Sequence, residues 1–220
     1  MAKLIEVATR LQDLYEQNYT SNDRFFDIGD FKFWVATTYS SMLNALMQSE
    51  RKINKGTDGF ANVEIPAQWM IEQTVSIQYD ELDRKYYATL PNDVYSFDFD
   101  NFSYALQDVY GIGCLSECKY RKISFSEVRF RGVAPPVSVI FYYLNSAKEI
   151  VFWGAKKDAK IKVRYVPKVV GEDDNCLLSD NIVEALSDVV LKRMFAARTG
   201  NIVDKVNDQN PNRVAPQNNQ

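Results

Sequence analysis

The stretch Val137–Pro167 constrains the fold of this chain more than any other, because it has the pattern of three β-strands joined by two short turns. Strands are predicted at 137–143 and 149–153, which are runs of β-branched and aromatic residues, and at 160–166, where charged and apolar residues alternate. Pro167 ends the last strand, because proline has no N–H to donate to a neighbouring strand. We therefore expect an antiparallel meander with one buried and one solvated face, which needs cover from another element.

Helical patterns lie on both sides of this stretch. Apolar residues recur every three to four positions in 2–17, in 30–55 and in 179–199, which is the spacing of an amphipathic helix. Asp30 is the expected N-cap of the second helix, and Gly200 is expected to end the third. The third helix is expected to cover the apolar face of the meander.

Further strand patterns precede the meander. A hairpin is predicted from 69–79 and 85–90, and a second pair of strands from 106–112 and 115–123. The predicted fold class is therefore α+β. It has N-terminal helices, a central antiparallel β-rich region covered by a C-terminal helix, and an extended C-terminal arm.

The chain has 220 residues, which suits one domain with extensions. We expect an N-terminal helical region at 1–56, a β-rich body with its C-terminal helix at 57–200, and a polar arm at 201–220. The arm is too polar to pack by itself, so it is predicted to become ordered on a partner. Its sparse apolar residues are the expected anchors: Ile202, Val203, Val206 and Val214.

The chain contains no histidine, which excludes Ser-His-Asp and Cys-His catalysis and metal sites built on imidazole. It also has no Walker A loop, GxGxxG turn, HExxH helix or calcium loop. We therefore predict no catalytic residues and no cofactor. No apolar run approaches the ~20 residues that a membrane-spanning helix needs, so no membrane association is expected.

Three cysteines, Cys114, Cys118 and Cys176, do not make a disulfide framework, and we expect a reducing site of synthesis. The C-x3-C spacing of the first two could begin a zinc site. Only one further thiol and no histidine are present to complete it, so no metal is predicted.

Charge is segregated along the chain. Residues 1–118 carry 9 basic and 18 acidic side chains (net −9), residues 119–168 carry 12 and 3 (net +9), and residues 169–220 carry 5 and 8 (net −3). The basic block could be a surface for a protein partner, a solvated sheet face, or a contact for DNA. Its clearest cluster is a basic face on one side of the last predicted strand: Lys160, Lys162 and Arg164.

Three stretches in a fixed order carry a resemblance to a known family. DELDRKYYATLPNDVYSF (Asp80–Phe97) places LP-x-D after a hairpin, KIKVRYVPK (Lys160–Lys168) contains V-x-Y-x-P, and an acidic turn leads to SDNIVEALSDVVLKRMFAAR (Ser179–Arg198). This order resembles the head-to-tail connector proteins of tailed bacteriophages, also called adaptor or gatekeeper proteins. The likeness is greatest to the tail-tube-A type of short-tailed phages and to the portal-proximal rings of crAss-like phages.

The resemblance implies a structural virion protein without turnover chemistry. It implies a homo-oligomeric ring, commonly of twelve subunits, that is stacked under the portal at the head–tail junction and continues the DNA channel. The implied partners are the portal protein, neighbouring tail and ring proteins, and packaged DNA through non-specific contact. Such a protein is synthesised in the host cytoplasm and located in the virion.

Two other classes of function fit the composition. The chain could be a soluble binding domain for a carbohydrate or other ligand, with 13 tyrosines and 3 tryptophans available for an exposed aromatic cleft. It could also be a histidine-free hydrolase that uses a carboxylate pair among Asp93, Asp98 and Asp100.

Overall fold

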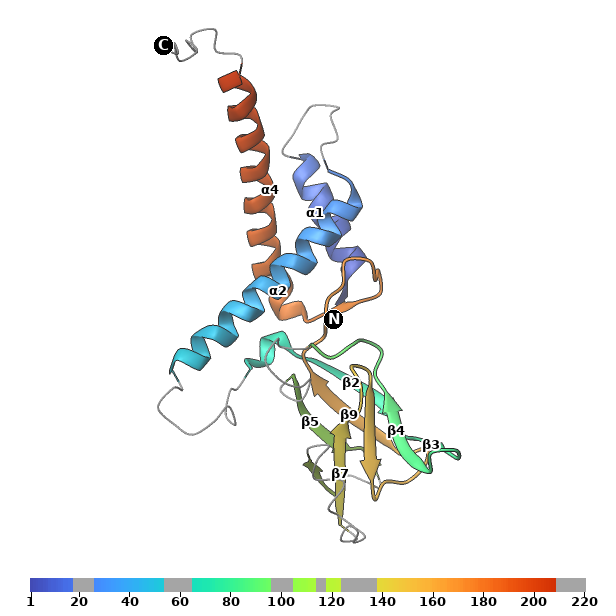
Figure 1. Ribbon diagram of the computed structural model, residues 1–220. Coiled ribbons are helices and arrows are strands. Elements are labelled where there is room, and N and C mark those ends of the chain that lie inside the picture. The colour runs from blue at the N-terminus through green and yellow to red at the C-terminus, as the bar shows by residue number, and fades with distance from the viewer. Residues whose placement is uncertain (18–25, 54–64, 96–104, 114–117, 124–137, 209–220) are drawn as a thin grey trace, which may run out of the picture.

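The computed structural model describes six segments of the chain: residues 1–17, 26–53, 65–95, 105–113, 118–123 and 138–208. The helices gather at one end of the molecule and the strands at the other (Figure 1). The predicted α+β class is confirmed, as is the packing of a C-terminal helix on the β-rich region.

Three long helices form the helical end: α1 (Leu4–Gln17), α2 (Ile28–Ile53) and α4 (Asp180–Asp208). They contact one another, and α4 also contacts η1 (Ala67–Trp69), a 3₁₀ turn that leads directly into the first strand of the β-rich region. Apolar side chains at helical spacing are fully buried where the helices meet, as the amphipathic patterns predict. Examples from α1, α2 and α4 are Leu4, Leu11, Val35, Leu43, Leu186 and Val190.

The start of α2 corrects the predicted N-cap. The helix begins at Ile28, and Asp27 precedes it. The Asp27 carboxylate accepts a hydrogen bond from the Asp30 N–H at 2.9 Å, and the Asp30 carboxylate accepts one from the Asp27 N–H at 2.9 Å. Two backbone donors are thus satisfied reciprocally, as in a capping box. Asp27 therefore caps the helix, and the prediction of Asp30 was wrong by one turn.

The end of α4 corrects a second prediction. The helix continues through Gly200 to Asp208, so Gly200 does not end it. A glycine inside a helix costs only about 1 kcal/mol relative to alanine, which a long helix tolerates. The apolar positions 202, 203 and 206 also keep the three-to-four spacing of a helix. The first part of the predicted extended arm is therefore helical, and residues 209–220 lie outside the described residues.

One sheet has three antiparallel strands in the order β2-β9-β5. Its strands are β2 (Ile71–Ser76), β9 (Lys160–Tyr165) and β5 (Leu106–Gly111). The central strand, β9, pairs with β2 from Ile71↔Tyr165 to Ser76↔Lys160. No two strands of this sheet are consecutive in the chain.

The second sheet has five strands in the order β3-β4-β8-β7-β6. They are β3 (Gln78–Asp80), β4 (Lys85–Thr89), β8 (Glu149–Trp153), β7 (Val139–Leu144) and β6 (Lys119–Lys122). All neighbours are antiparallel except β6 and β7, which run parallel.

A small third sheet ties the N-terminus to the segment before α4. It pairs β1 (Ala2–Lys3) with β10 (Leu177–Leu178).

The predicted meander is correct for two strands and wrong for the third. β7 and β8 form the expected antiparallel pair, but β9 leaves them and joins the other sheet. The chain changes direction between β8 and β9, where Gly154 and Asp158 adopt positive φ values of 86° and 63°. The Asp158 N–H then donates to the Ile77 carbonyl at 2.8 Å, which directs β9 alongside β2.

The other predicted pairings also change. The predicted strand 69–79 divides at Ile77 into β2 and β3, and only β3 forms the expected hairpin with β4. β5 and β6, predicted as a pair, lie in different sheets. The predicted strands are present, but β2, β5 and β6 pair with strands other than the predicted ones. The alternation of polar and apolar residues determines which side of a strand is buried, but it does not determine which strand lies beside it.

A single hydrophobic cluster joins the helices and both large sheets. Inner-face residues of the three-stranded sheet, the five-stranded sheet and α4 all belong to it. Examples are Ile71, Ile161, Val163, Ala88, Ile150, Phe152, Leu186 and Met194.

Candidate functional site

The predicted basic face lies on the outer side of the three-stranded sheet. On β9, Lys160, Lys162 and Arg164 alternate with the fully buried Ile161 and Val163. Lys160 is exposed, whereas the two other cations are half-buried. The three cations therefore share one solvated side of a strand whose other side forms core.

One carboxylate organises part of this face. Glu72 on β2 accepts a hydrogen bond from Lys162 Nζ at 2.8 Å and from the Tyr110 hydroxyl, and lies 3.5 Å from Arg164 Nη2. The bonds from Lys162 and then Tyr110 hold the pKa of the Glu72 carboxyl below its ordinary value. The same bonds raise the pKa of Lys162 and of Tyr110. Two of the three predicted cations are thus partly neutralised within the chain, which leaves Lys160 as the most available one.

Sequence reasoning missed Glu72 and Tyr110 as members of this face. Glu72 belongs to the polar side of the strand pattern in β2, but that pattern does not say which strand lies beside it. The register brings the residues together: Glu72 lies opposite Arg164, and Tyr110 of β5 lies opposite Lys162. The missing information is the pairing of β9 with β2 and β5.

A second charged group links the two large sheets. Lys122 on β6 donates from Nζ to the Leu106 carbonyl of β5 at 2.8 Å. Burial lowers the pKa of the Lys122 ammonium to about 8, because a charged group loses hydration there. Its register neighbour Tyr142 on β7 has a pKa raised to about 12, again by burial first. Lys122 thus connects β6, at one edge of the five-stranded sheet, with β5, at one edge of the three-stranded sheet.

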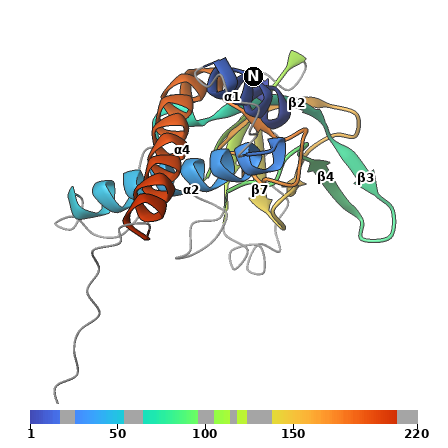
Figure 2. The ribbon, with the colours of Figure 1, turned by 90° about the horizontal axis from the view of Figure 1, so that it is seen from above.

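The β3–β4 hairpin carries the most exposed apolar side chain of the described residues. Leu82, at the tip, is 95% exposed. The hairpin extends away from the rest of the β-rich region in both views (Figures 1 and 2). This element therefore presents a leucine to solvent at a distance from the core.

Of the three acidic residues considered for a carboxylate pair, only Asp93 lies among the described residues. Asp93 lies 3.5 Å from Lys148 Nζ, and its carbonyl accepts a hydrogen bond from the Lys168 N–H at 2.7 Å. Asp98 and Asp100 lie outside the described residues. Among the residues that are described, no three acidic or sulfur side chains group closely enough to hold a metal ion.

Cysteines Cys118 and Cys176 are free thiols, and Cys114 lies outside the described residues. Cys176 is buried and its thiol donates to the Lys168 carbonyl at 3.1 Å. Burial raises the pKa of this thiol to about 11, so the thiolate is scarce at neutral pH.

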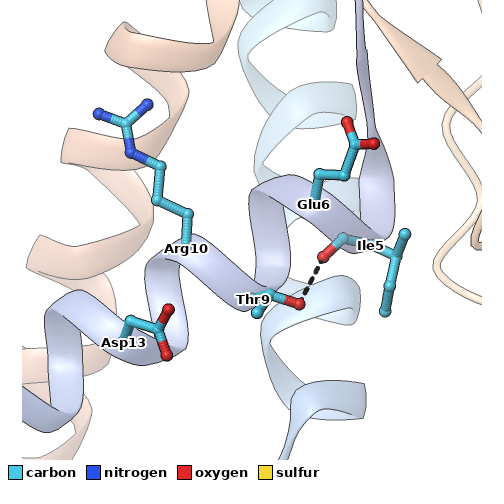
Figure 3. A pocket seen from close by; sticks show the side chains of 5 residues that line it. All are labelled: Ile5, Glu6, Thr9, Arg10 and Asp13. Atoms are coloured by element: carbon cyan, nitrogen blue, oxygen red, sulfur yellow. Dashed lines mark hydrogen bonds between the residues drawn. The ribbon is translucent and has the colours of Figure 1, made fainter.

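A shallow hollow of about 370 Å³ lies along one side of α1. Its lining residues all come from that helix: Ile5, Glu6, Thr9, Arg10 and Asp13. Figure 3 shows these side chains spread along the helix, with the Thr9 hydroxyl donating to the Ile5 carbonyl at 2.9 Å. Side chains of a single helix that spread in this way do not converge on a common point, so the hollow has no arrangement suited to catalysis.

The predicted arm anchors fall into two groups. Positions 202, 203 and 206 are part of α4, and position 214 lies outside the described residues. In Figure 1 the C-terminal part of α4 extends beyond the other helices. The backbone thus places the first three anchors on a helix rather than on an extended segment.

Two sequence motifs named above meet in one joint. Val94, which follows LP-x-D, forms an antiparallel bridge with Pro167, which ends V-x-Y-x-P. The Tyr95 N–H donates to the Val166 carbonyl at 2.9 Å, and the buried Asn92 lies in the same turn. The two motifs therefore form one structural unit where the β-rich region meets the segment leading to α4.

Exposed aromatic residues are few in the described part of the chain. Phe33, on α2, is 62% exposed and Tyr110, on β5, is 38% exposed. They lie on different elements, and most other described aromatics pack in the core or are half-buried.

No protein-family model matches this chain, and no curated protein is similar to it in sequence. No helix among the described residues is long and apolar enough to cross a membrane.

Proposed function

We propose that this chain is a structural subunit of a ring that connects the portal of a tailed bacteriophage to its tail and continues the DNA channel. The proposed partners are other copies of the chain, the portal protein and neighbouring tail or ring proteins. The proposed location is the head–tail junction of the virion. The role needs no catalytic residue and no cofactor.

The observation that supports this proposal best is the joint between the two motifs of the resemblance. LP-x-D and V-x-Y-x-P are about 70 positions apart in the chain, yet Val94 and Pro167 pair directly. A resemblance carried by residues that contact each other in the fold is stronger than one carried by residues that lie far apart. Next to this joint, the Tyr95 hydroxyl donates to Asn44 Oδ1 of α2 at 3.2 Å, which links the β-rich region to the helical end. A subunit that transmits contacts between neighbours above and below needs such a link.

Surface properties support the same proposal. Charge is segregated along the chain, with a net charge of −9 in residues 1–118 and +9 in residues 119–168. A hairpin and a long helix extend from the body (Figure 1). Ring subunits contact each other through two different patches, so projections and complementary charge are useful to them.

The mass of the purified protein in solution tests this proposal. A ring subunit should form a particle many times the 25.3 kDa of one chain, either alone or after mixing with the portal protein of the same phage. Class averages from electron microscopy should show rotational symmetry. A protein that stays monomeric under both conditions contradicts the proposal.

A further inference from the structure

The tip of the β3–β4 hairpin has an unusual combination of exposure and apolar character. Leu82 is 95% exposed, whereas the next most exposed large apolar side chain among the described residues, Phe33, is 62% exposed. Exposed leucines are common singly, but this one stands at the end of a projecting hairpin, where another molecule can reach all of it.

The tip is also held in one conformation. The Asp80 carboxylate accepts hydrogen bonds from the Leu82 N–H at 2.9 Å and the Asp83 N–H at 3.3 Å. Lys85 lies 3.1 Å from Asp83 and 3.2 Å from Glu149 on β8, which fixes the base of the turn. A preorganised tip loses little conformational entropy when it docks, so more of the free energy of its contacts contributes to the binding affinity.

The charges around Leu82 indicate what kind of surface can bind the tip. From the end of β3 to the start of β4 the chain carries three carboxylates, Asp80, Glu81 and Asp83, and two cations, Arg84 and Lys85. Lys85 is paired with Asp83 and with Glu149, which leaves Glu81 as the carboxylate directly beside Leu82. An apolar contact inside an acidic rim fits a surface that offers an apolar patch with cations around it.

The outer face of the three-stranded sheet offers the cations of β9 and the ring of Tyr110, beside the carboxylates of Glu72 and Asp108. Lys160 is exposed there and, among the described residues, has no ion-pair partner. The ring of Tyr110 is 38% exposed, and the Lys162 ammonium lies 5.9 Å from its centroid. In Figure 1 the hairpin and β5 lie at opposite margins of the β-rich region, so a hairpin from one copy can reach the face of the next. Contact between two different patches is the arrangement that closes a ring.

We infer that the β3–β4 hairpin of one subunit docks on the outer face of the three-stranded sheet of a second copy of this chain. Leu82 packs against Tyr110 of the neighbour, and Glu81 lies near Lys160 of the neighbour. This inference rests on the proposed ring and goes beyond it, because it names the two surfaces that meet.

A charge exchange tests the pairing in full-length protein. Glu81→Lys and Lys160→Glu should each raise the concentration needed for half-maximal assembly by about tenfold, because like charges then face each other. The double variant should return to within about threefold of the wild type, since every interface regains an opposite pair. Leu82→Ser should weaken assembly by about 10- to 100-fold, as loss of an apolar anchor does.

Glu16→Lys supplies the matched control, because it reverses the charge of an exposed glutamate on α1, away from both surfaces. It should assemble like the wild type, and all variants should keep the wild-type circular dichroism and melting temperature. If the wild type forms rings and Leu82→Ser assembles normally, the hairpin contact is refuted while the ring function stands. If Leu82→Ser fails but the charge exchange does not restore assembly, the receiving face is wrong. If the wild type stays monomeric even with the portal protein, the ring function itself fails.

Discussion

The two large sheets are assembled from the chain in different ways. The five-stranded sheet contains two antiparallel pairs of consecutive strands that are joined by short turns, β3 with β4 and β7 with β8. The three-stranded sheet takes β2, β5 and β9 from three distant parts of the chain. Local sequence patterns therefore describe much of the first sheet, whereas the second depends on contacts that only the complete fold brings together.

The strand β9 shows this difference most clearly. It follows β8 directly in the chain but pairs with β2 and β5. Its alternating pattern fits any sheet that has one solvated face, so the pattern cannot select the neighbours. The selection comes from the positive φ values at Gly154 and Asp158 and from the hydrogen bonds of Ile77.

The largest expected effect comes from truncating matched core residues in the two sheets. Ile161 on β9 and Ile150 on β8 are both fully buried. Ile161→Ala and Ile150→Ala should each reduce the free energy of unfolding by about 2–5 kcal/mol. Because both residues belong to one hydrophobic cluster, each variant should shift a single urea transition measured by fluorescence and circular dichroism.

Two separated transitions in either variant would show that the sheets unfold independently. The exposed Ser76→Ala at the edge of the three-stranded sheet is a suitable control, with an expected change within about 0.5 kcal/mol.

The elements themselves were largely predictable from sequence, because helix and strand periodicity is local. The stripe through Leu186 and Val190 correctly predicts the buried side of α4. The cap at Asp27 and the continuation past Gly200 were not predicted, because single capping residues compete with neighbours that fit almost as well.

The candidate surface was predictable only in part. Three cations on β9 follow from alternation, but their association with Glu72 and Tyr110 needs the register of three strands. The exposed Leu82 was missed for a different reason: a leucine in a turn between two strands gives no periodic signal of its own.

A second prediction concerns the link between the sheets at Lys122. The folded protein lowers the pKa of this ammonium to about 8, whereas an unfolded lysine titrates near 10.4. Between these values the unfolded chain binds more protons, so stability should rise with pH, by up to about 1.4 kcal/mol per pH unit. Above about pH 10 the trend should reverse, because buried tyrosines such as Tyr142 have a raised pKa and ionise first in the unfolded chain.

Lys122→Met isolates this contribution, since it removes the titrating group and keeps an unbranched side chain of similar length. Urea unfolding at pH 7, 8 and 9 should show a rise for the wild type and a smaller one for the variant. Equal rises in both proteins would place the pH dependence elsewhere.

A third prediction concerns the helical end where it meets the three-stranded sheet. Tyr39 on α2 packs on Trp69, with ring centroids 5.3 Å apart, and its buried hydroxyl has no hydrogen-bond partner among the described residues. Burial raises the pKa of this phenol far above its ordinary value. Tyr39→Phe removes the cost of burying an unpaired hydroxyl and should leave stability unchanged or raise it by about 1 kcal/mol.

Tyr95→Phe is the matched comparison, because the Tyr95 hydroxyl donates to Asn44 Oδ1 at 3.2 Å. Loss of that bond should cost about 0.5–1.5 kcal/mol. A loss of the same size in Tyr39→Phe, measured by thermal and urea unfolding, would mean that the Tyr39 hydroxyl has a bonding partner after all.

The smallest effects are expected for cross-strand ion pairs on the solvated faces, one in each sheet. Glu72 holds Lys162 and Arg164 in the three-stranded sheet, and Glu149 lies 3.2 Å from Lys85 in the five-stranded sheet. Glu72→Gln should cost at most about 1 kcal/mol, since these groups are partly exposed and screened by solvent. Glu149→Gln should cost less, because Lys85 keeps Asp83 at 3.1 Å.

The dependence on pH and salt distinguishes the Glu72 contribution from a change in packing. The folded protein lowers the pKa of Glu72, so its contribution is present above the ordinary glutamate pKa and is lost as pH falls through the lower folded value. The wild type and Glu72→Gln should therefore differ at pH 7 and converge in acid, and the difference should shrink in 1 M salt. A difference that persists at low pH and in high salt would mean that Glu72 stabilises the three-stranded sheet through packing and not through its charge. The solvated faces of the two sheets would then differ in side-chain packing as well as in the number of cations paired with Glu72 and with Glu149.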